Sequence, residues 1–131
     1  MAIDQTLISE ALRARENAVA PFSKFKVGAA LRTKDGKIYR GCNVENCTYG
    51  LTVCAERVAL LSALAAGERT FDAIAVSSQS DDPATPCGPC RQLLWEYCGD
   101  IEIALVNLEG KRIDYRLSQL FPHPFTFSPE E

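Results

Sequence analysis

The chain has 131 residues, of which 47% are hydrophobic and 24% are charged, and its formal net charge at pH 7 is -3. This length fits a single domain, 1–131, and is too short for two domains of ordinary size. The composition is that of a globular protein, which excludes collagen-like, coiled-coil and disordered classes. The acidic balance lacks the broad basic surface that grips a phosphate backbone, so we expect no nucleic-acid partner and favour a small neutral or cationic ligand.

The sequence also indicates the cellular compartment in which the protein is expected. Its first residues show no basic stretch followed by an apolar one, so a secretory signal is not expected. The longest strongly apolar segment, 58–66, is interrupted by Ser62 and is far shorter than the roughly 20 residues that cross a bilayer. We therefore expect a soluble cytoplasmic protein with no membrane partner. In that reducing compartment the six cysteines are metal ligands, catalytic thiols or small core residues, and not disulfides.

The first half of the chain predicts a helix, a hairpin and a second helix. Apolar residues recur at helical spacing over 3–19, and Pro21 ends that pattern. Two strand patterns follow, over 25–32 and 37–41, and an Asp-Gly turn joins them into a β-hairpin. The segment 54–66 is rich in Ala, Leu, Glu and Arg, which favours a second helix.

The second half alternates strand and helix patterns. The expected elements are a strand over 71–77, a helix over 88–97, and strands over 101–106 and 112–115. Three prolines mark the tail that follows: Pro122, Pro124 and Pro129. Strands that alternate with helices of about three turns predict a central sheet covered by helices, an α/β layered fold.

Three of the six cysteines have the spacing of metal ligands. Cys87 and Cys90 form a Cys-x-x-Cys at the start of the third predicted helix, where the first turn brings positions three apart to the same side. Cys54 stands in the same way at the start of the second helix. Helix N-termini carry partial positive charge, which favours the thiolate form and metal binding. The pattern therefore predicts a zinc site with three thiolate ligands.

The fourth coordination position decides whether such a zinc is catalytic or structural. Structural zinc is closed by four protein ligands, whereas catalytic zinc keeps one position for water. Glu56, two residues after Cys54, can reach that water without binding the metal, as general acid/base hydrolysis requires. A structural zinc module that only binds partners remains the alternative, and it needs a fourth protein ligand. The other residues that could supply it are not at a tight ligand spacing from the three cysteines: Cys42, Cys47, Cys98 and His123. We interpret Cys42, Cys47 and Cys98 as packing residues.

Cys-x-Glu followed by Pro-Cys-x-x-Cys is the signature of zinc-dependent nucleobase and nucleoside deaminases, in the version where cysteine replaces the first histidine. On these motifs the chain resembles the cytidine deaminases of the small homotetrameric class, within the zinc-dependent cytidine/deoxycytidylate deaminase family. The similar stretches span most of the chain in the family's order: residues 21–30, residues 41–46, Tyr49, residues 54–57 and residues 86–92.

The resemblance implies a fold, a reaction and an assembly. The fold would be a three-layer α/β/α sandwich with a mixed five-stranded sheet. The reaction would be hydrolytic deamination of cytidine and 2′-deoxycytidine to uridine and 2′-deoxyuridine in pyrimidine salvage, with release of ammonia. One Zn²⁺ per chain would be held by Cys54, Cys87 and Cys90, and Glu56 would move protons between the attacking water and the base. The assembly would be a homotetramer with shared active sites.

The resemblance also implies which residues hold the nucleoside. Asn43 and Glu45 would hold the ribose 3′-hydroxyl. The backbone N–H of Ala55 would meet the pyrimidine O2, and Phe25 would pack on the base.

Further residues would act at the edge of the site. Tyr49 and Phe125 would lie near a neighbouring subunit's pocket, with Phe127 as the alternative to Phe125 because the tail carries an extra proline. Arg57 would hydrogen-bond a zinc-binding sulfur, where its positive charge would offset part of the charge of three thiolates. Arg91 could be only a charge on the helix surface, and it stays outside the predicted site.

Two other deaminase classes share the zinc motifs. A blasticidin-type aminonucleoside deaminase would not be expected to carry Asn43-x-Glu45-Asn46 together with Tyr49, so cytidine is the favoured substrate. A polynucleotide-editing deaminase is disfavoured by the acidic balance and by the absence of a Lys/Arg run.

Overall fold

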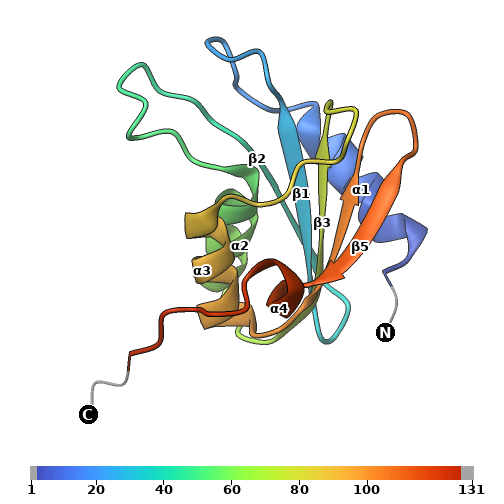
Figure 1. Cartoon of the computed structure of the whole chain (residues 1–131), viewed down its shortest axis with the longest axis vertical. Coiled ribbons are helices and arrows are strands. Elements are labelled where there is room, and N and C mark those ends of the chain that lie inside the picture. Colours follow the sequence, from blue (N-terminus) through green and yellow to red (C-terminus); the bar gives the residue numbers. More distant parts are fainter. Residues whose placement is uncertain (1–2, 128–131) are drawn as a thin grey trace.

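A mixed five-stranded sheet forms the middle of the computed structural model, which describes residues 3–127 (Figure 1). Residues 1–2 and 128–131, among them Pro129 of the predicted tail, lie outside the described residues. The strand order is β2-β1-β3-β4-β5; β3 and β4 are parallel, and the other neighbouring pairs are antiparallel. The strands are β1 (Val27–Thr33), β2 (Ile38–Cys42), β3 (Phe71–Ser78), β4 (Glu102–Val106) and β5 (Arg112–Arg116).

Helices cover both faces of this sheet (Figure 1). The long helices are α1 (Gln5–Arg15), α2 (Ala55–Ala65) and α3 (Gly88–Cys98). One sheet face packs on α1 mainly through alanines, and the opposite face packs its larger side chains on α2 and α3. These layers confirm the predicted three-layer α/β/α sandwich with a mixed sheet. Within residues 3–127 no helix combines the length and the apolar character that a membrane crossing needs.

Two glycines let a helix lie directly on a strand. A Cβ at Gly41 in β2 would lie 2.4 Å from the carbonyl oxygen of Ala55 in α2. A Cβ at Gly28 in β1 would lie 2.2 Å from the carbonyl oxygen of Ala11 in α1. Both contacts are with backbone atoms, which cannot swing away as a flexible side chain can. The missing side chains therefore set the distance of each helix layer from the sheet.

The first helix is shorter than its apolar pattern predicts. It begins at Gln5 because the Asp4 side chain accepts a hydrogen bond from the Leu7 N–H at 3.1 Å, as an N-cap does. It ends at Arg15, and Val19 instead donates its N–H to the carbonyl oxygen of Asn43 at 2.9 Å. The prediction that the helix continues to residue 19 was wrong because this tertiary contact takes over the end of the segment.

The first strand begins two residues later than predicted. Phe25 lies before β1, since its N–H donates to Ser23 Oγ at 3.0 Å and its carbonyl oxygen accepts from Asn43 Nδ2 at 2.8 Å. Side chains thus satisfy the backbone groups that a strand would pair with its neighbour. The start of the predicted strand at residue 25 was wrong, and Phe25 belongs to a loop.

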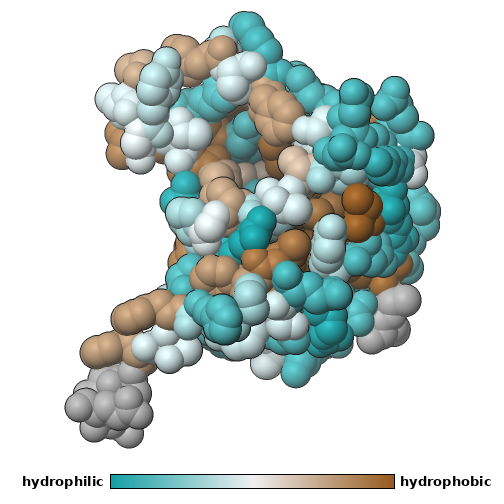
Figure 2. All heavy atoms as spheres, viewed as in Figure 1, coloured by the Kyte–Doolittle hydropathy of each residue, from teal (hydrophilic) through white to brown (hydrophobic). Residues whose placement is uncertain are grey.

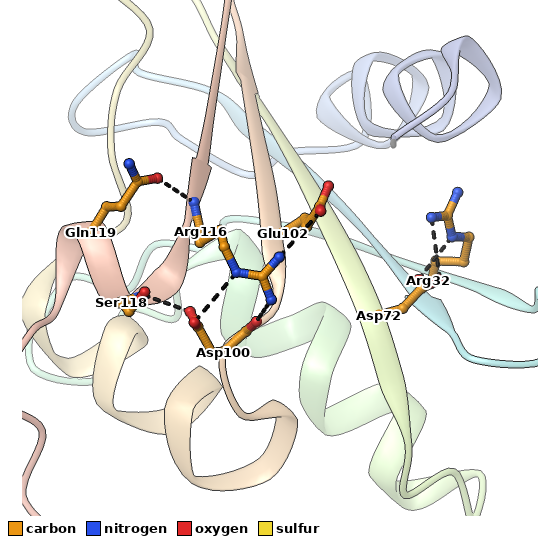
Figure 3. Close-up of polar contacts among 7 residues, drawn as sticks. All are labelled: Arg32, Asp72, Asp100, Glu102, Arg116, Ser118 and Gln119. Atoms are coloured by element: carbon orange, nitrogen blue, oxygen red, sulfur yellow. Dashed lines mark hydrogen bonds and ion pairs between the residues drawn. The ribbon is translucent and has the colours of Figure 1, made fainter. Parts of the chain in front are cut away.

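A short helix that the sequence pattern does not predict, α4 (Leu117–Leu120), follows β5 directly. The Ser118 N–H donates to Asp100 Oδ1 at 2.7 Å, and the Arg116 N–H donates to Gln119 Oε1 at 2.7 Å (Figure 3). The Arg116 guanidinium also reaches the Asp100 carboxylate at 3.4 Å. Four residues are too few to show a helical period, so the turn is explained by these polar contacts, two of which are with Asp100 in the loop before β4.

Candidate functional site

Three sulfurs meet where α2 and α3 begin. Cys54 is the N-cap of α2, Cys87 is the N-cap of α3, and Cys90 lies in the first turn of α3. All three Sγ atoms lie within 4.8 Å of one another, with Cys54 to Cys87 at 3.8 Å and Cys87 to Cys90 at 3.3 Å. Tetrahedral thiolates at 2.3 Å from zinc would be about 3.8 Å apart, so the cluster fits one zinc ion with small adjustments.

The cluster has three members and leaves room for a non-protein ligand. No other His, Cys, Asp or Glu side chain among residues 3–127 joins it. A structural zinc module requires a fourth protein ligand, and the described part of the chain does not supply one. The donor set therefore matches a catalytic zinc better than a structural one.

Positive charge surrounds the sulfurs. Hydrogen bonds from Cys90, Cys87 and Arg57 lower the pKa of the Cys54 thiol below its ordinary value. Arg57 Nη2 lies 3.9 Å from Cys54 Sγ and donates to the carbonyl oxygen of Thr52 at 3.1 Å. The two helix N-termini add further positive potential. Together these groups favour the thiolate form of Cys54, which is the form that binds zinc.

Glu56 is a buried carboxyl beside the sulfurs. It lies in the first turn of α2, only 6% of its surface is exposed, and burial raises the pKa of its carboxyl to about 7. Such a group can both accept and donate a proton near neutral pH. Since Glu56 and Cys54 line the same cavity, the carboxyl can act on a molecule that lies next to the metal cluster.

A cavity of about 200 Å³ opens in front of Glu56. Small-molecule pockets usually enclose about 300–1,000 Å³, so one chain alone does not surround a ligand of nucleoside size. A second hollow, which shares Thr52 with the first, extends the site toward Glu45 and Tyr49. The cavity is lined by Phe25, Val27, Asn43, Thr52, Val53, Cys54, Ala55, Glu56, Val76, Ala84, Thr85 and Cys87.

Asn43 fixes the loop that forms one wall of this cavity. Its Nδ2 donates to the carbonyl oxygen of Phe25 at 2.8 Å, and its Oδ1 accepts from the Val27 N–H at 2.9 Å. One N–H and one lone pair of the amide remain for a ligand. The half-buried Phe25 ring lines the same cavity. Asn43 can therefore hold Phe25 in place and contact a ligand as well.

Glu45 and Tyr49 line the neighbouring hollow and not the cavity itself. Glu45 accepts hydrogen bonds from the N–H groups of Phe22 at 2.9 Å and Ser23 at 3.1 Å, and also from the Ser23 hydroxyl. The hydroxyl contact with Ser23 is the main cause that lowers the pKa of the Glu45 carboxyl. The carboxylate stays charged and is held at the mouth of the site.

Ala55 begins α2 at the wall of the cavity. As the first residue of α2 its N–H has no partner inside the helix, and the residue lines the cavity. A carbonyl oxygen of a ligand at this point would meet the positive end of the helix.

The tail aromatics lie elsewhere. Phe125 and Phe127 are 71% and 76% exposed, and neither lines the cavity of its own chain. Figure 2 shows the apolar C-terminal segment standing away from the body of the molecule. Gln92 holds this segment, because its side-chain amide donates to the carbonyl oxygen of Phe125 at 2.8 Å and accepts from the Phe125 N–H at 3.0 Å.

Several lining residues were not anticipated from the sequence. They are Val27, Thr52, Val53, Val76, Ala84 and Thr85. Ala84 and Thr85 come just before the Pro86-Cys87 motif, so their place next to the metal cluster could have been inferred from the motif. The others come from two strands, β1 and β3, and from the loop before α2, whose relative positions the sequence pattern does not reveal.

Comparisons with known proteins give a consistent result. Residues 1–105 match the family model described as the cytidine and deoxycytidylate deaminase zinc-binding region. The chain is 50% identical over 123 residues to a cytidine deaminase of Halalkalibacterium halodurans, covering 93% of each chain. The crystal structure of cytidine deaminase from Burkholderia pseudomallei matches with a TM-score of 0.90 and 50% identity, over 95% of this chain and 100% of that one. A blasticidin-S deaminase of Bacillus cereus is 36% identical over 112 residues, 79% of each chain.

Proposed function

The chain belongs to the zinc-dependent cytidine and deoxycytidylate deaminase family, and we propose that it hydrolyses cytidine and 2′-deoxycytidine to uridine and 2′-deoxyuridine with release of ammonia. The observation that carries this proposal is the buried Glu56 carboxyl in one cavity with Cys54 and Cys87. A module that only binds partners has no use for a buried carboxyl that lines such a cavity.

The reaction requires an activated water and a group that moves protons. Zinc supplies Lewis acidity that makes water a nucleophile at neutral pH. Glu56 accepts a proton from the attacking water and delivers it to N3 of the base as the new C–O bond forms at C4. Glu56 then takes the proton of the new C4 hydroxyl group and gives it to the amino group, and the C4–N bond breaks as the C4 carbonyl forms, which releases ammonia. Since its pKa is near 7, the same carboxyl can serve in both directions.

Four residues would orient the nucleoside. Phe25 packs against the pyrimidine, and the N–H of Ala55 donates to its O2. The remaining N–H of Asn43 and the charged Glu45 bind the ribose 3′-hydroxyl. Supporting this, Phe25, Asn43 and Ala55 line the cavity, and Glu45 lines the adjoining hollow.

The assembly would be a homotetramer in which neighbouring chains complete each site. The cavity of one chain is small, and Tyr49 and Phe125 are 72% and 71% exposed, as aromatic side chains that enter another subunit's pocket would be. Gel filtration at the size of a monomer would contradict the shared site.

A cytoplasmic role in pyrimidine salvage completes the proposal. The free state of all six cysteines supports a reducing compartment. The acidic net charge supports a free nucleoside as substrate, with no nucleic acid and no membrane as partner. All described strands belong to one sheet, which supports a single domain over 1–131.

A blasticidin-type activity is the less favoured alternative. The identity to the cytidine deaminase of Halalkalibacterium halodurans is 50% over 93% of the chain, against 36% over 79% for the blasticidin-S enzyme. An assay with both substrates separates the two activities, because the favoured reaction requires turnover of cytidine.

The test uses purified protein with its zinc content measured per chain. Ultraviolet absorbance is followed with cytidine, 2′-deoxycytidine, cytosine and blasticidin S as substrates. Glu56→Gln should keep zinc and lower kcat by about 10²- to 10⁴-fold, because the amide cannot move the proton. The exposed Glu109→Gln is the matched control and should retain wild-type turnover. Zinc-loaded wild-type protein that turns over neither cytidine nor 2′-deoxycytidine would contradict the proposal, and a fully active Glu56→Gln would contradict the role of Glu56.

A further inference from the structure

Arg91 connects two parts of the chain that are distant in sequence. Its Nε donates to the carbonyl oxygen of Pro86 at 2.7 Å, and its Nη2 donates to Thr85 Oγ1 at 2.9 Å. Its Nη1 donates to the carbonyl oxygen of Leu120, the last residue of α4. One planar guanidinium thus holds the residues before Cys87 and the end of the last helix together.

Arg91 forms hydrogen bonds with the backbone on both sides of the Cys87 side chain. The Arg91 side chain donates to the carbonyl oxygen of Pro86, and the backbone N–H of Arg91 donates to the carbonyl oxygen of Cys87 at 3.0 Å. The Cα of Cys87, which carries the sulfur-bearing side chain, lies between these two carbonyl groups. Thr85, the third partner, lines the cavity beside Glu56. We call residues 85–87 the ligand segment.

The other end of the connection is itself held firmly. Figure 3 shows α4 tied to the loop before β4, where Asp100 accepts from the Ser118 N–H at 2.7 Å and meets the Arg116 guanidinium at 3.4 Å. Gln119 closes the first turn by accepting the Arg116 N–H at 2.7 Å. The carbonyl oxygen of Leu120 is therefore a fixed anchor and not the end of a loose tail.

Helix stability does not explain a cation at this position. Arg91 lies near the N-terminus of α3, where the helix dipole disfavours positive charge. No acidic side chain forms an ion pair with it in the part of the chain that the structure describes. The interactions of the guanidinium at this position are its hydrogen bonds to three neutral oxygen atoms.

We propose that Arg91 is a positioning residue that braces the ligand segment against α4, so that Cys87 keeps its place in the metal cluster and zinc is retained. The brace rests on the metal site of the proposed function, although it requires nothing about which nucleoside is turned over. Outer partners that orient metal ligands typically change metal affinity or activity by about 10- to 100-fold when they are removed. Loss of the Arg91 contacts should therefore raise the rate of zinc release by about ten-fold or more.

The experiment compares zinc release from Arg91→Gln with that from Arg69→Gln. Arg69 makes the same kind of contact, since its Nη1 donates to the carbonyl oxygens of Leu64 at 2.9 Å and Glu68 at 2.7 Å, but it lies in the loop after the C-terminus of α2. Holoprotein is mixed with a coloured zinc chelator at a temperature well below the Tm of every variant. Arg91→Gln should release zinc about ten-fold faster than wild type, while Arg69→Gln should release it at the wild-type rate even where its Tm is lower.

Two milder variants keep the test decisive if Arg91→Gln does not fold. Arg91→Lys keeps the charge but has one ammonium in place of the fork, so it should release zinc at an intermediate rate. Thr85→Val removes only one of the three contacts and should give a smaller increase. Zinc release from these variants at the wild-type rate would overturn the proposal. A release rate that only follows Tm across Arg69→Gln and the Arg91 variants would also overturn it. Turnover of cytidine by wild type is measured separately, so failure of the proposed function would leave this comparison intact.

Discussion

The contact between Gly41 and α2 gives a sharp prediction about how the sheet positions the site. In Gly41→Ala the new Cβ would lie 2.4 Å from the carbonyl oxygen of Ala55 and 2.4 Å from the N of Ala59. Ordinary van der Waals contact begins at 3.4 Å, so α2 must retreat from β2 by about 1 Å. The first turn of α2 carries Glu56, and its N-cap is Cys54, so the proposed proton-transfer group and one cysteine of the metal cluster move together.

The magnitude follows from this displacement. Overpacking of this kind costs about 1–3 kcal/mol in the free energy of unfolding, which lowers Tm by several degrees. A misplacement of about 1 Å near the reacting groups can reduce the rate by about 10²-fold. We therefore expect Gly41→Ala to fold with a lower Tm and to lose about 100-fold in kcat/KM for cytidine.

Gly28→Ala is the matched control. Its Cβ would lie 2.2 Å from the carbonyl oxygen of Ala11 and 2.4 Å from the N of Arg15, so the backbone clash is as severe. The helix that it displaces is α1, which contributes no lining residue to the cavity. Both variants are melted by circular dichroism and then assayed well below their Tm. Wild-type kcat/KM in Gly41→Ala, or an equal loss of kcat/KM in Gly28→Ala, would refute the reasoning.

Two further predictions concern polar and thiol groups. Asn43→Asp keeps the acceptor for the Val27 N–H but removes the donor to the carbonyl oxygen of Phe25, so the loop that carries Phe25 should shift. We expect KM for cytidine to rise about ten-fold, with a smaller change in kcat. An unchanged KM in steady-state kinetics would contradict this. Burial raises the pKa of the Cys98 thiol to about 12, so at pH 8 iodoacetamide should label the exposed Cys47 well before Cys98. Peptide mass maps measure the two labelling rates, and equal rates would show that Cys98 is accessible.

Local patterns were sufficient for much of the architecture. The cysteine pair at the start of α3 and Cys54 at the start of α2 were placed correctly, because capping positions and helix composition act over a few residues. The Asp-Gly turn of the β1–β2 hairpin is equally local. Alternation of helices and strands then led to the layered fold.

The errors arose where distant groups compete for the backbone. Phe25 fits an alternating strand, yet Asn43, 18 residues later, takes its carbonyl oxygen. The extension of the first helix to Val19 failed for a similar reason, because Val19 pairs with Asn43. Arg91 reads as a surface charge in sequence, whereas its partner at Leu120 is 29 residues away. No window of the sequence contains both members of such pairs.

The sequence by itself determined the candidate groups of the site: three cysteines, one carboxyl and the motif spacing that relates the chain to a deaminase family. Only the tertiary structure decided that the three cysteines meet in one cluster and that Glu56 lines one cavity with Cys54 and Cys87. Cys54 and Cys87 are 33 residues apart, and they meet because α2 and α3 lie on the same face of the sheet with their N-termini together (Figure 1). The reason is physical: residue types set what a group can do, whereas packing of helices on a sheet sets which groups come within reach of one another.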